Sequence, residues 1–351
     1  MQFEDRIRAG LSGDYEGLAN GFNRINDYIY NVQRATYTLI GGLSGASKTT
    51  LVDFMILNAL EDAETKGINV DVDYYSWEIN EVTKRANWLS IIIYNKYNRV
   101  ISPQKIKGLG ALRLDEDEQQ IVFDEIPNLN RLFAKINWHW VPTNPTGIYN
   151  HLWKKMSLKG TFIKEEYTDE NGETKEKITG YIANDPNTYH IGILDHIALA
   201  KLERGFTLKL NIDKISEYCV ILRNLFRMTF FIVQQFNQGL SGIERIKFKG
   251  VDISPNQSDF KDSTNPYTDA DVVLGLLNAY KMDLETSLNY NINIEGFQYN
   301  LKGKYRLLKV IKNREGSDSI AIGLYTKPEA GYFEELPKEM TIEDYKMYLN
   351  K

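Results

Sequence analysis

The fold follows from the segment TYTLIGGLSGASKTT, residues 36–50. Residues 36–40 are β-branched, aromatic or apolar, which predicts a buried strand. Gly41 and Gly42 end that strand, and from Lys48 onward the apolar residues recur at helical spacing. A strand, a glycine-containing loop and a helix in this order are typical of a loop that holds phosphate with backbone N–H groups and a helix N-terminus.

The loop departs from the phosphate-loop pattern at one position. That pattern is Gly, any four residues, Gly, Lys and then Ser or Thr, and Ser47 stands where the second glycine is expected. A serine there must either tolerate the glycine conformation or widen the loop. The residues predicted to contact a nucleotide are Gly42, Ser44, Gly45, Ala46, Ser47, Lys48, Thr49 and Thr50. The alternative is a glycine-rich turn that caps a helix and leaves Lys48 solvated.

Strand and helix patterns alternate outward from this loop, which implies parallel strands joined by right-handed crossovers. We expect helices at 48–66, 81–97, 103–132, 144–156 and 213–227, with a helical lead-in before residue 34. We expect further strands at 68–77, 138–141, 191–195, 229–233, 271–277 and 306–311, with 321–325 as a hairpin partner. The charged segment around Asn171-Gly172 predicts an inserted β-hairpin at about residues 160–183, because Asn-Gly favours two-residue turns.

Composition limits the class of protein. The 351 residues include 42 basic and 47 acidic side chains, for a net charge of −5, so contact with nucleic acid requires a local basic surface. The single cysteine, Cys219, cannot form an internal disulfide. No segment reaches the roughly 18 consecutive apolar residues that span a bilayer. These features predict a cytoplasmic protein that does not contact membranes.

Polar residues follow several predicted strands. Asp195 ends one strand and is a candidate for the Mg²⁺ shell, together with Thr49 in the loop. Glu78 ends another and can polarise an attacking water, while Gln235 can sense the γ-phosphate by hydrogen bonding. Each also has a plainer explanation, as a polar strand end or a carboxylate favoured by a helix N-terminus.

Two cations, Lys312 and Arg314, stand near the end of the strand at 306–311. An arginine that reaches a neighbouring subunit's phosphates acts as an arginine finger. The alternative is a solvated basic turn.

The order of these segments resembles the ATPase domain of DnaB-type replicative helicases. SWEIN at 76–80 is similar to the family's Ser-Leu-Glu-Met-Ser, LDHI at 194–197 to its Asp-Tyr-Leu strand, and QFN at 235–237 to its Gln-Leu-Asn motif. SDFKDS at 258–263 followed by DAD at 269–271 resembles Ser-Asp-Leu-Arg-Glu-Ser and Asp-Ala-Asp. KNREG at 312–316 resembles Lys-x-Arg-x-Gly, and residues 17–26 resemble the segment before the first core strand.

The resemblance implies an α/β fold, a RecA-like P-loop NTPase with a mostly parallel central sheet flanked by helices. Residues 1–20 would be a linker or docking helix, 21–335 the ATPase domain and 336–351 a C-terminal tail. ATP and Mg²⁺ would be the cofactors. Lys48 would bind phosphate, Glu78 would be the catalytic base, and Lys312 and Arg314 would act in trans. Contacts with single-stranded DNA would come from Lys261, Asp262 and Ser263. Lys247 and Lys249 stand in the same irregular loop and are further candidates, and the alternative is that they are solvated loop lysines.

The expected assembly is a hexameric ring, with a primase or a loader protein as a further partner. The tyrosine- and asparagine-rich composition and the atypical phosphate loop suggest a phage-encoded variant in the host cytoplasm. The residues before Gly17 are too few for the family's primase-binding domain, which we therefore expect to be missing. Gln238 stands where the family often has arginine. Ser47 and the short N-terminal segment keep one alternative open, a nucleotide-binding scaffold or regulatory ring with weak or no hydrolysis. A recombinase-like or loader ATPase is a further alternative.

Overall fold

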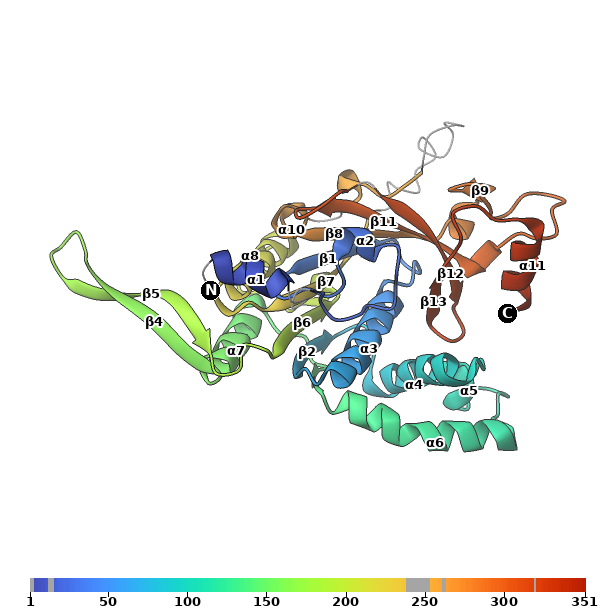
Figure 1. The fold of residues 1–351 in the computed structure, drawn as a ribbon, viewed down its shortest axis with the longest axis horizontal. Helices are drawn as coiled ribbons and strands as arrows, with labels where there is room; N and C mark the ends of the chain where they lie inside the picture. The colour runs from blue at the N-terminus through green and yellow to red at the C-terminus, as the bar shows by residue number, and fades with distance from the viewer. Residues whose placement is uncertain (1–2, 12–15, 238–252, 261–262, 319) are drawn as a thin grey trace.

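A computed structural model describes residues 3–11, 16–237, 253–260, 263–318 and 320–351. Its centre is a nine-stranded sheet of order β13-β12-β11-β8-β1-β7-β6-β2-β3 (Figure 1). Six neighbouring strands run parallel, and they are β1 (Tyr37–Gly42), β2 (Val70–Ser76), β3 (Ile136–His139), β6 (Tyr189–Asp195), β7 (Thr229–Gln235) and β8 (Val272–Leu277). Three antiparallel strands extend one edge, namely β11 (Tyr305–Asn313), β12 (Ala321–Lys327) and β13 (Tyr332–Glu335). The predicted fold class is confirmed.

Helices cover both faces of the sheet, which is why its central strands are apolar on both sides. Along β1, Leu39 packs into one apolar cluster and Ile40 into another, because successive side chains of a strand point to opposite faces. The Ile40 face is covered by α3 (Lys48–Lys66), α4 (Glu81–Tyr97) and α6 (Glu116–Phe133). The Leu39 face is covered by α7 (Pro145–Ser157) and α8 (Leu208–Phe226).

Capping residues explain where the main helices begin and end. The side chain of Asn80 accepts a hydrogen bond from the Thr83 N–H, and Asn98 ends α4 in the left-handed conformation. Gly67, with φ +66°, ends α3 in the same way. The helix expected at 81–97 therefore has the predicted bounds.

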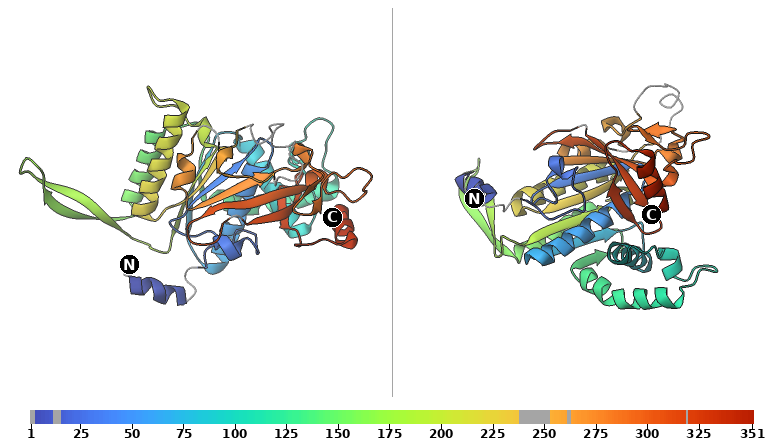
Figure 2. Two further views of the ribbon diagram at one scale, coloured as in Figure 1. Left: turned by 90° about the horizontal axis from the view of Figure 1, so that it is seen from above. Right: turned by 45° about the vertical axis from the view of Figure 1, so that its right-hand side comes forward.

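The predicted hairpin is confirmed as a separate two-stranded sheet, β4 (Gly160–Thr168) paired with β5 (Thr174–Ala183). The predicted two-residue turn is wrong, because residues 169–173 join the two strands. It projects from the body of the molecule (Figures 1 and 2). Its base is held by aromatic contacts, since the rings of Phe162 and Tyr181 both lie edge-on to Phe226 of α8. Its outer part is exposed, as its charged sequence predicts.

The ends of the chain differ from expectation. In the described part of the lead-in before residue 34, helix is confined to α1 (Phe3–Leu11) and α2 (Asn26–Ile29). Glycines favour turns there, and Gly17 and Gly21 both have positive φ. Residues 336–351 are more than a tail, since α11 (Ile342–Asn350) buries Tyr345 and Tyr348. The strand expected at 138–141 begins two residues earlier, and β13 had no counterpart in the sequence patterns.

The remaining elements are short. They are α5 (Pro103–Ile106), α10 (Asn265–Asp269), β9 (Thr286–Ser287) and β10 (Tyr290–Asn291). Among the described residues, every helix is too short or too polar to cross a membrane.

Candidate nucleotide-binding site

The predicted phosphate loop joins β1 to α3 at the carboxyl end of the parallel strands, where open α/β sheets bind ligands. A cavity of about 180 Å³ opens there. Its lining comes from the loop and from three other segments, and consists of Ser44, Gly45, Ser47, Lys48, Thr49, Glu78, His196 and Gln235. The structure thus brings Lys48, Thr49, Glu78 and Gln235 together as the sequence predicted. His196 follows Asp195 and was not predicted.

Ser47 adopts the conformation that the missing glycine would have used. Its φ of 75° and ψ of 33° are left-handed, a region that costs a non-glycine residue about 1–2 kcal/mol. Its hydroxyl accepts a hydrogen bond of 3.2 Å from Nη2 of Arg306, in β11. Serine therefore tolerates the tight loop. Gly45 also has a left-handed φ of +74°, and a Cβ there would lie 2.2 Å from the Lys281 Nζ unless that side chain moved.

Arg306 contacts the phosphate loop through Ser47, and the sequence patterns did not single it out. It is 4% exposed, and its Nη1 donates to the carbonyl oxygens of Gly303 (2.8 Å) and Tyr305 (2.7 Å). Burial lowers the pKa of Arg306 to about 10. Its Nε has no hydrogen-bond partner among the described residues. A buried, incompletely paired cation against the phosphate loop favours an anion in the neighbouring cavity.

Lys48 lies over the loop, where its Nζ donates to the Leu43 carbonyl oxygen at 3.0 Å. Burial lowers the pKa of Lys48, while Glu78 and Asp195 oppose that shift. Thr50, the last residue predicted to contact nucleotide, does not line the cavity. Its methyl group lies near Gly331 instead. Ala46 is buried within the loop.

Asp195 is 1% exposed at the end of β6, in register with Ser76 of β2. Neither of its carboxylate oxygens accepts a hydrogen bond within 3.5 Å from the described residues. Burial raises the pKa of Asp195, and nearby Lys84 and Thr49 oppose that rise. An unpaired buried carboxylate beside a threonine hydroxyl matches the hard oxygen ligands that Mg²⁺ prefers. The residues present therefore fit the predicted metal.

A buried polar network supports Asp195 from inside the fold. Lys84 of α4 is 0% exposed, and its Nζ lies 3.0 Å from both carboxylate oxygens of Asp53 in α3. The Tyr74 hydroxyl donates to Asp53 at 2.9 Å. Burial raises the pKa of Asp53, and Lys84 opposes that rise. The sequence patterns did not predict this network. Its one signal in the sequence is Asp53, a charged residue within the apolar run Leu51–Leu57.

Lys312 and Arg314 lie at the other end of the sheet. Asn313 pairs with Val272 at the start of β8, whereas Gly42 pairs with Leu276, four residues or about 13 Å further along. The Lys312 Nζ donates to the carbonyl oxygens of Tyr267 (2.9 Å) and Thr268 (2.7 Å), and the Arg314 Nη1 lies 3.4 Å from Asp271. Within one chain these cations do not meet the phosphate loop.

Of the predicted DNA contacts, Lys247, Lys249, Lys261 and Asp262 lie outside the described residues, as does Gln238. Ser263 is 4% exposed, and its hydroxyl hydrogen-bonds to Asp213 rather than facing solvent.

The end of β7 is hydrogen-bonded to and packed against Asp259, Phe260 and Ser263, which flank the predicted DNA-contacting residues Lys261 and Asp262. Gln234 Nε2 donates to the Ser263 carbonyl oxygen at 3.1 Å, and the Asn237 N–H donates to that of Asp259 at 2.8 Å. The rings of Phe236 and Phe260 pack edge to face. The candidate sensor Gln235 is therefore tied on both sides to residues 259–263.

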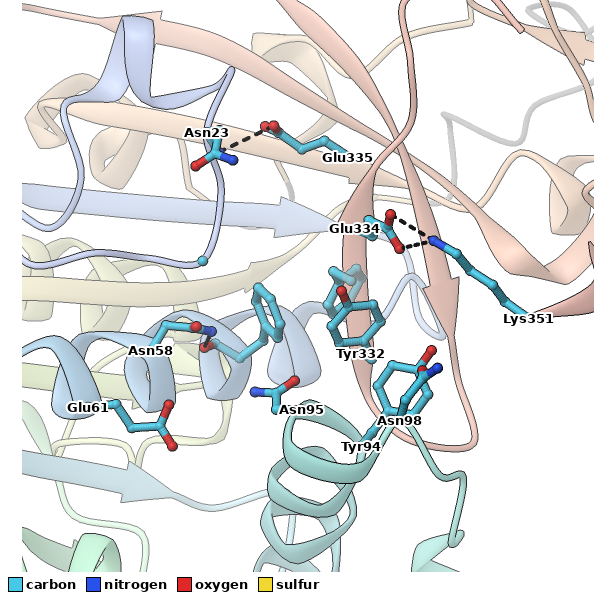
Figure 3. Close-up of a pocket in the computed structure, with 13 residues that line it drawn as sticks. Asn23, Asn58, Glu61, Tyr94, Asn95, Asn98, Tyr332, Glu334, Glu335 and Lys351 are labelled. Carbon is cyan, nitrogen blue, oxygen red and sulfur yellow. Dashed lines mark hydrogen bonds and ion pairs between the residues drawn. The ribbon is translucent and has the colours of Figure 1, made fainter. Parts of the chain in front are cut away.

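A second, larger hollow of about 820 Å³ lies between α3, α4 and β13. Figure 3 shows its mostly polar lining, which includes Asn58, Glu61, Asn95 and Lys351. It contains none of the predicted site residues. The predicted nucleotide-binding residues line the smaller cavity instead.

The sheet order, the phosphate loop and the acidic strand ends define a P-loop fold of the RecA-like kind. A search of protein-family models finds no match, and a search of curated proteins finds none. Many solved structures share the fold, including two that match at least 95% of this chain. One is a DnaB-like replicative helicase described with its interactions with primase, with a TM-score of 0.67 and 14% identity over 95% of this chain and 66% of that chain.

The other solved structure is a separate ATPase domain, with a TM-score of 0.67 and 14% identity over 96% of this chain and 99% of that domain. The chain thus spans just under two thirds of the first protein but nearly all of the second. At this identity the likeness establishes the fold, which is that of the ATPase domain of DnaB-like helicases.

Proposed function

We propose that this chain is an ATP-driven helicase motor that forms a ring and moves along single-stranded DNA. The observation that carries the proposal is the division of the functional residues between opposite ends of the sheet. The phosphate loop, Glu78 and Gln235 share one end, and Arg314 stands at the other. A head-to-tail contact between copies brings the two ends together, and such contacts close into rings when the rotation permits. The family resemblance suggests six subunits.

Each residue has a distinct task in this proposal. The loop N–H groups and Lys48 bind the ATP phosphates, and Thr49 with Asp195 holds Mg²⁺, which neutralises phosphate charge when it is bound. Glu78 orients the attacking water and accepts its proton. Arg314 of the neighbouring subunit, with Lys312, stabilises the charge that develops on the transferred phosphoryl group.

The ties between β7 and residues 259–263 provide a route from nucleotide to DNA. A change at Gln235 on hydrolysis would move the segment held by Gln234 and Asn237. That segment leads into Lys261 and Asp262, and Lys247 and Lys249 belong to the same stretch of chain. Contacts of this kind with DNA phosphates are independent of sequence and weaken as salt rises.

Mixing two inactive variants tests the completion of the site in trans. Lys48→Ala removes phosphate binding, and Arg314→Ala should lower ATP turnover about 10³-fold or more while each subunit still binds nucleotide. In a mixed ring, the intact loop of an Arg314→Ala subunit meets the intact arginine of a Lys48→Ala subunit. We expect mixing to restore a measurable fraction of the ATP turnover of the unmodified protein.

A matched control mixes Lys48→Ala with a Lys48→Ala, Arg314→Ala double variant, in which no interface is complete. Turnover in that mixture should stay at the background level. If the mixture of single variants is equally inactive although its subunits co-assemble, Arg314 does not act in trans. If Lys48→Ala alone keeps ATP turnover and unwinding, the motor itself is disproved.

Ser47 favours a second candidate, a nucleotide-binding scaffold with weak or no hydrolysis. Arg306 holds the strained loop in place through the Ser47 hydroxyl, so a bound nucleotide can serve as a structural ligand. The distinguishing measurement is ATP hydrolysis with and without single-stranded DNA. Stimulation by DNA supports the motor, and turnover that stays absent in both conditions supports the scaffold. A closed ring seen by microscopy, rather than a filament, separates the motor from a recombinase-like ATPase.

The proposal includes partners and a location. One structural neighbour was studied with its primase, and we extend to this chain a contact with a primase or a loader protein, in the cytoplasm of the cell that replicates the DNA. Co-purification of the ring with the primase of the same genome would test that contact.

A further inference from the structure

Three of the four histidines of the chain gather around two aspartates at the β3 edge of the sheet. Asp71 and Asp73 are two residues apart on β2 and so share a face. His139 comes from β3 and His151 from α7, and both point a ring nitrogen at Asp73. The nucleotide site described above uses none of these groups.

The geometry points to a transition-metal site of the zinc class formed by Asp73, His139 and His151. Oδ1 of Asp73 lies 3.0 Å from Nε2 of His139 and 3.2 Å from Nε2 of His151. One donor atom from each of the three residues lies within 4.8 Å of the others. Two imidazoles and one carboxylate are the ligand types of zinc sites that keep a fourth position open.

The distances fit a metal ion as well as they fit hydrogen bonds. Metal–ligand bonds of about 2.0–2.1 Å at tetrahedral angles put neighbouring donor atoms about 3.3 Å apart. The two oxygen–nitrogen distances are close to that value, so the aspartate–histidine contacts need little adjustment. When no ion is bound, ring N–H groups can donate to the same carboxylate oxygen.

Surrounding contacts hold two of the ligands in position. The Tyr75 ring stacks on the His139 imidazole with centroids 4.2 Å apart and planes at 13°. The second oxygen of Asp73 accepts a hydrogen bond from the Lys155 Nζ at 2.6 Å, which leaves Oδ1 for the histidines. Outer contacts that orient ligands in this way are characteristic of metal sites in proteins.

Access is compatible with a divalent ion. Lys155 contacts both aspartates at 2.6 Å, and Lys159 contacts Asp71 at 2.5 Å, so Lys159 leaves the Asp73 carboxylate to Lys155 and the histidines. Asp73 is 2% exposed, whereas the His151 side chain is 46% exposed. Solvent therefore reaches the site from the α7 side, where a water can fill the fourth position. A bound ion would join β2 to β3 and α7, whose histidines lie 66 and 78 residues after Asp73 in the sequence.

The experiment uses Co²⁺ as a coloured probe for the zinc class, added to the full chain without nucleotide. We expect one Co²⁺ per chain, with the visible absorption of four-coordinate cobalt, and displacement of that cobalt by Zn²⁺. His151→Ala and His139→Gln should each weaken Co²⁺ binding by tenfold or more. Zn²⁺ should raise the thermal unfolding midpoint of the unmodified protein and leave that of His151→Ala nearly unchanged.

Two controls keep the outcome decisive. His196→Gln alters a histidine that lines the nucleotide cavity, and this variant should keep full Co²⁺ binding. Without added metal, the thermal unfolding of His151→Ala should remain a single cooperative transition with a midpoint close to that of the unmodified protein, because this side chain is 46% exposed. That result shows that the variant folds. The site is disproved if Co²⁺ does not bind, or if both His151→Ala and His139→Gln bind it as tightly as the unmodified protein does.

Discussion

Buried charged side chains have fewer hydrogen-bond partners at the carboxyl end of the central sheet than Asp271 has at its amino end. At the carboxyl end, the Asp195 carboxylate and the Arg306 Nε are buried without hydrogen-bond partners among the described residues. At the amino end, Asp271 accepts from the Tyr37 N–H at 2.8 Å and pairs with Arg223 at 2.7 Å and Arg314 at 3.4 Å. Unpaired buried charges cost stability, so Asp195 and Arg306 beside the phosphate loop favour a ligand that pairs with them.

The comparison also separates binding from assembly. At the amino end the Asp271 carboxylate is paired, and Arg314 presents 45% of its side chain to solvent. An exposed arginine at this position is suited to contact a neighbouring subunit. The carboxyl end holds the candidate nucleotide-binding residues, with Lys48 in the cavity lining and the exposed Lys281 beside Gly45. In the proposed ring, Arg314 of one subunit would be added to the candidate site of its neighbour.

The largest stability effect is expected at the buried pair behind Asp195. Lys84→Met leaves Asp53 charged and without its cation, which should lower the free energy of unfolding by about 3–5 kcal/mol. The adjacent Arg85 is a matched control, since its pair with Glu81 is 38% and 50% exposed. Arg85→Met should cost about 0.5 kcal/mol or less. Urea denaturation of both variants measures the difference, and equal effects would show that the buried pair contributes nothing special.

Two matched substitutions test the contrast between the ends directly. Asp271→Asn breaks the pair with Arg223 and should lower the free energy of unfolding of the nucleotide-free protein by about 2 kcal/mol. Asp195→Asn removes a buried, unpaired charge and should raise it. Denaturation of both variants at neutral pH gives opposite signs if the contrast holds and the same sign if it does not.

The Asp195→Asn effect should depend on pH. Burial raises the pKa of Asp195 in the folded state, so the folded protein binds this proton more tightly than the unfolded chain. The charge therefore costs stability as the pH rises from the ordinary aspartate range through the raised value. The advantage of Asp195→Asn should be greatest at neutral pH and should shrink in acid, which denaturation midpoints at several pH values can measure.

The smallest effect concerns the strained serine. Ser47→Ala keeps the left-handed conformation without the hydrogen bond from Arg306, whereas Ser47→Gly removes the strain. Glycine should be more stable than alanine at this position by about 1–2 kcal/mol. Thermal or urea unfolding of the two variants isolates the backbone cost, because neither can bond to Arg306. Equal stabilities would mean that the loop relaxes to another conformation.

Local patterns were sufficient where a single segment contains its own signals. The helix at 81–97 had its predicted bounds because Asn80 and Asn98 cap it, and the hairpin followed from Asn171-Gly172. Edge elements were harder, since β13 has four residues and α11 owes its place to the burial of Tyr345 and Tyr348. Short segments carry little periodicity, and their burial depends on neighbours that the local sequence does not specify.

The amino-acid sequence alone established the alternating strands and helices, the phosphate loop and the acids and amides at the strand ends, because these depend on side-chain periodicity and turn residues within a few positions. Only the tertiary structure showed that Arg306 supports Ser47 from 259 residues away, that Lys84 sits buried beside Asp53, and that Arg314 stands at the end of the sheet opposite Lys48. Such contacts arise from strand order and burial, which join residues remote in the chain and leave no periodic trace in it.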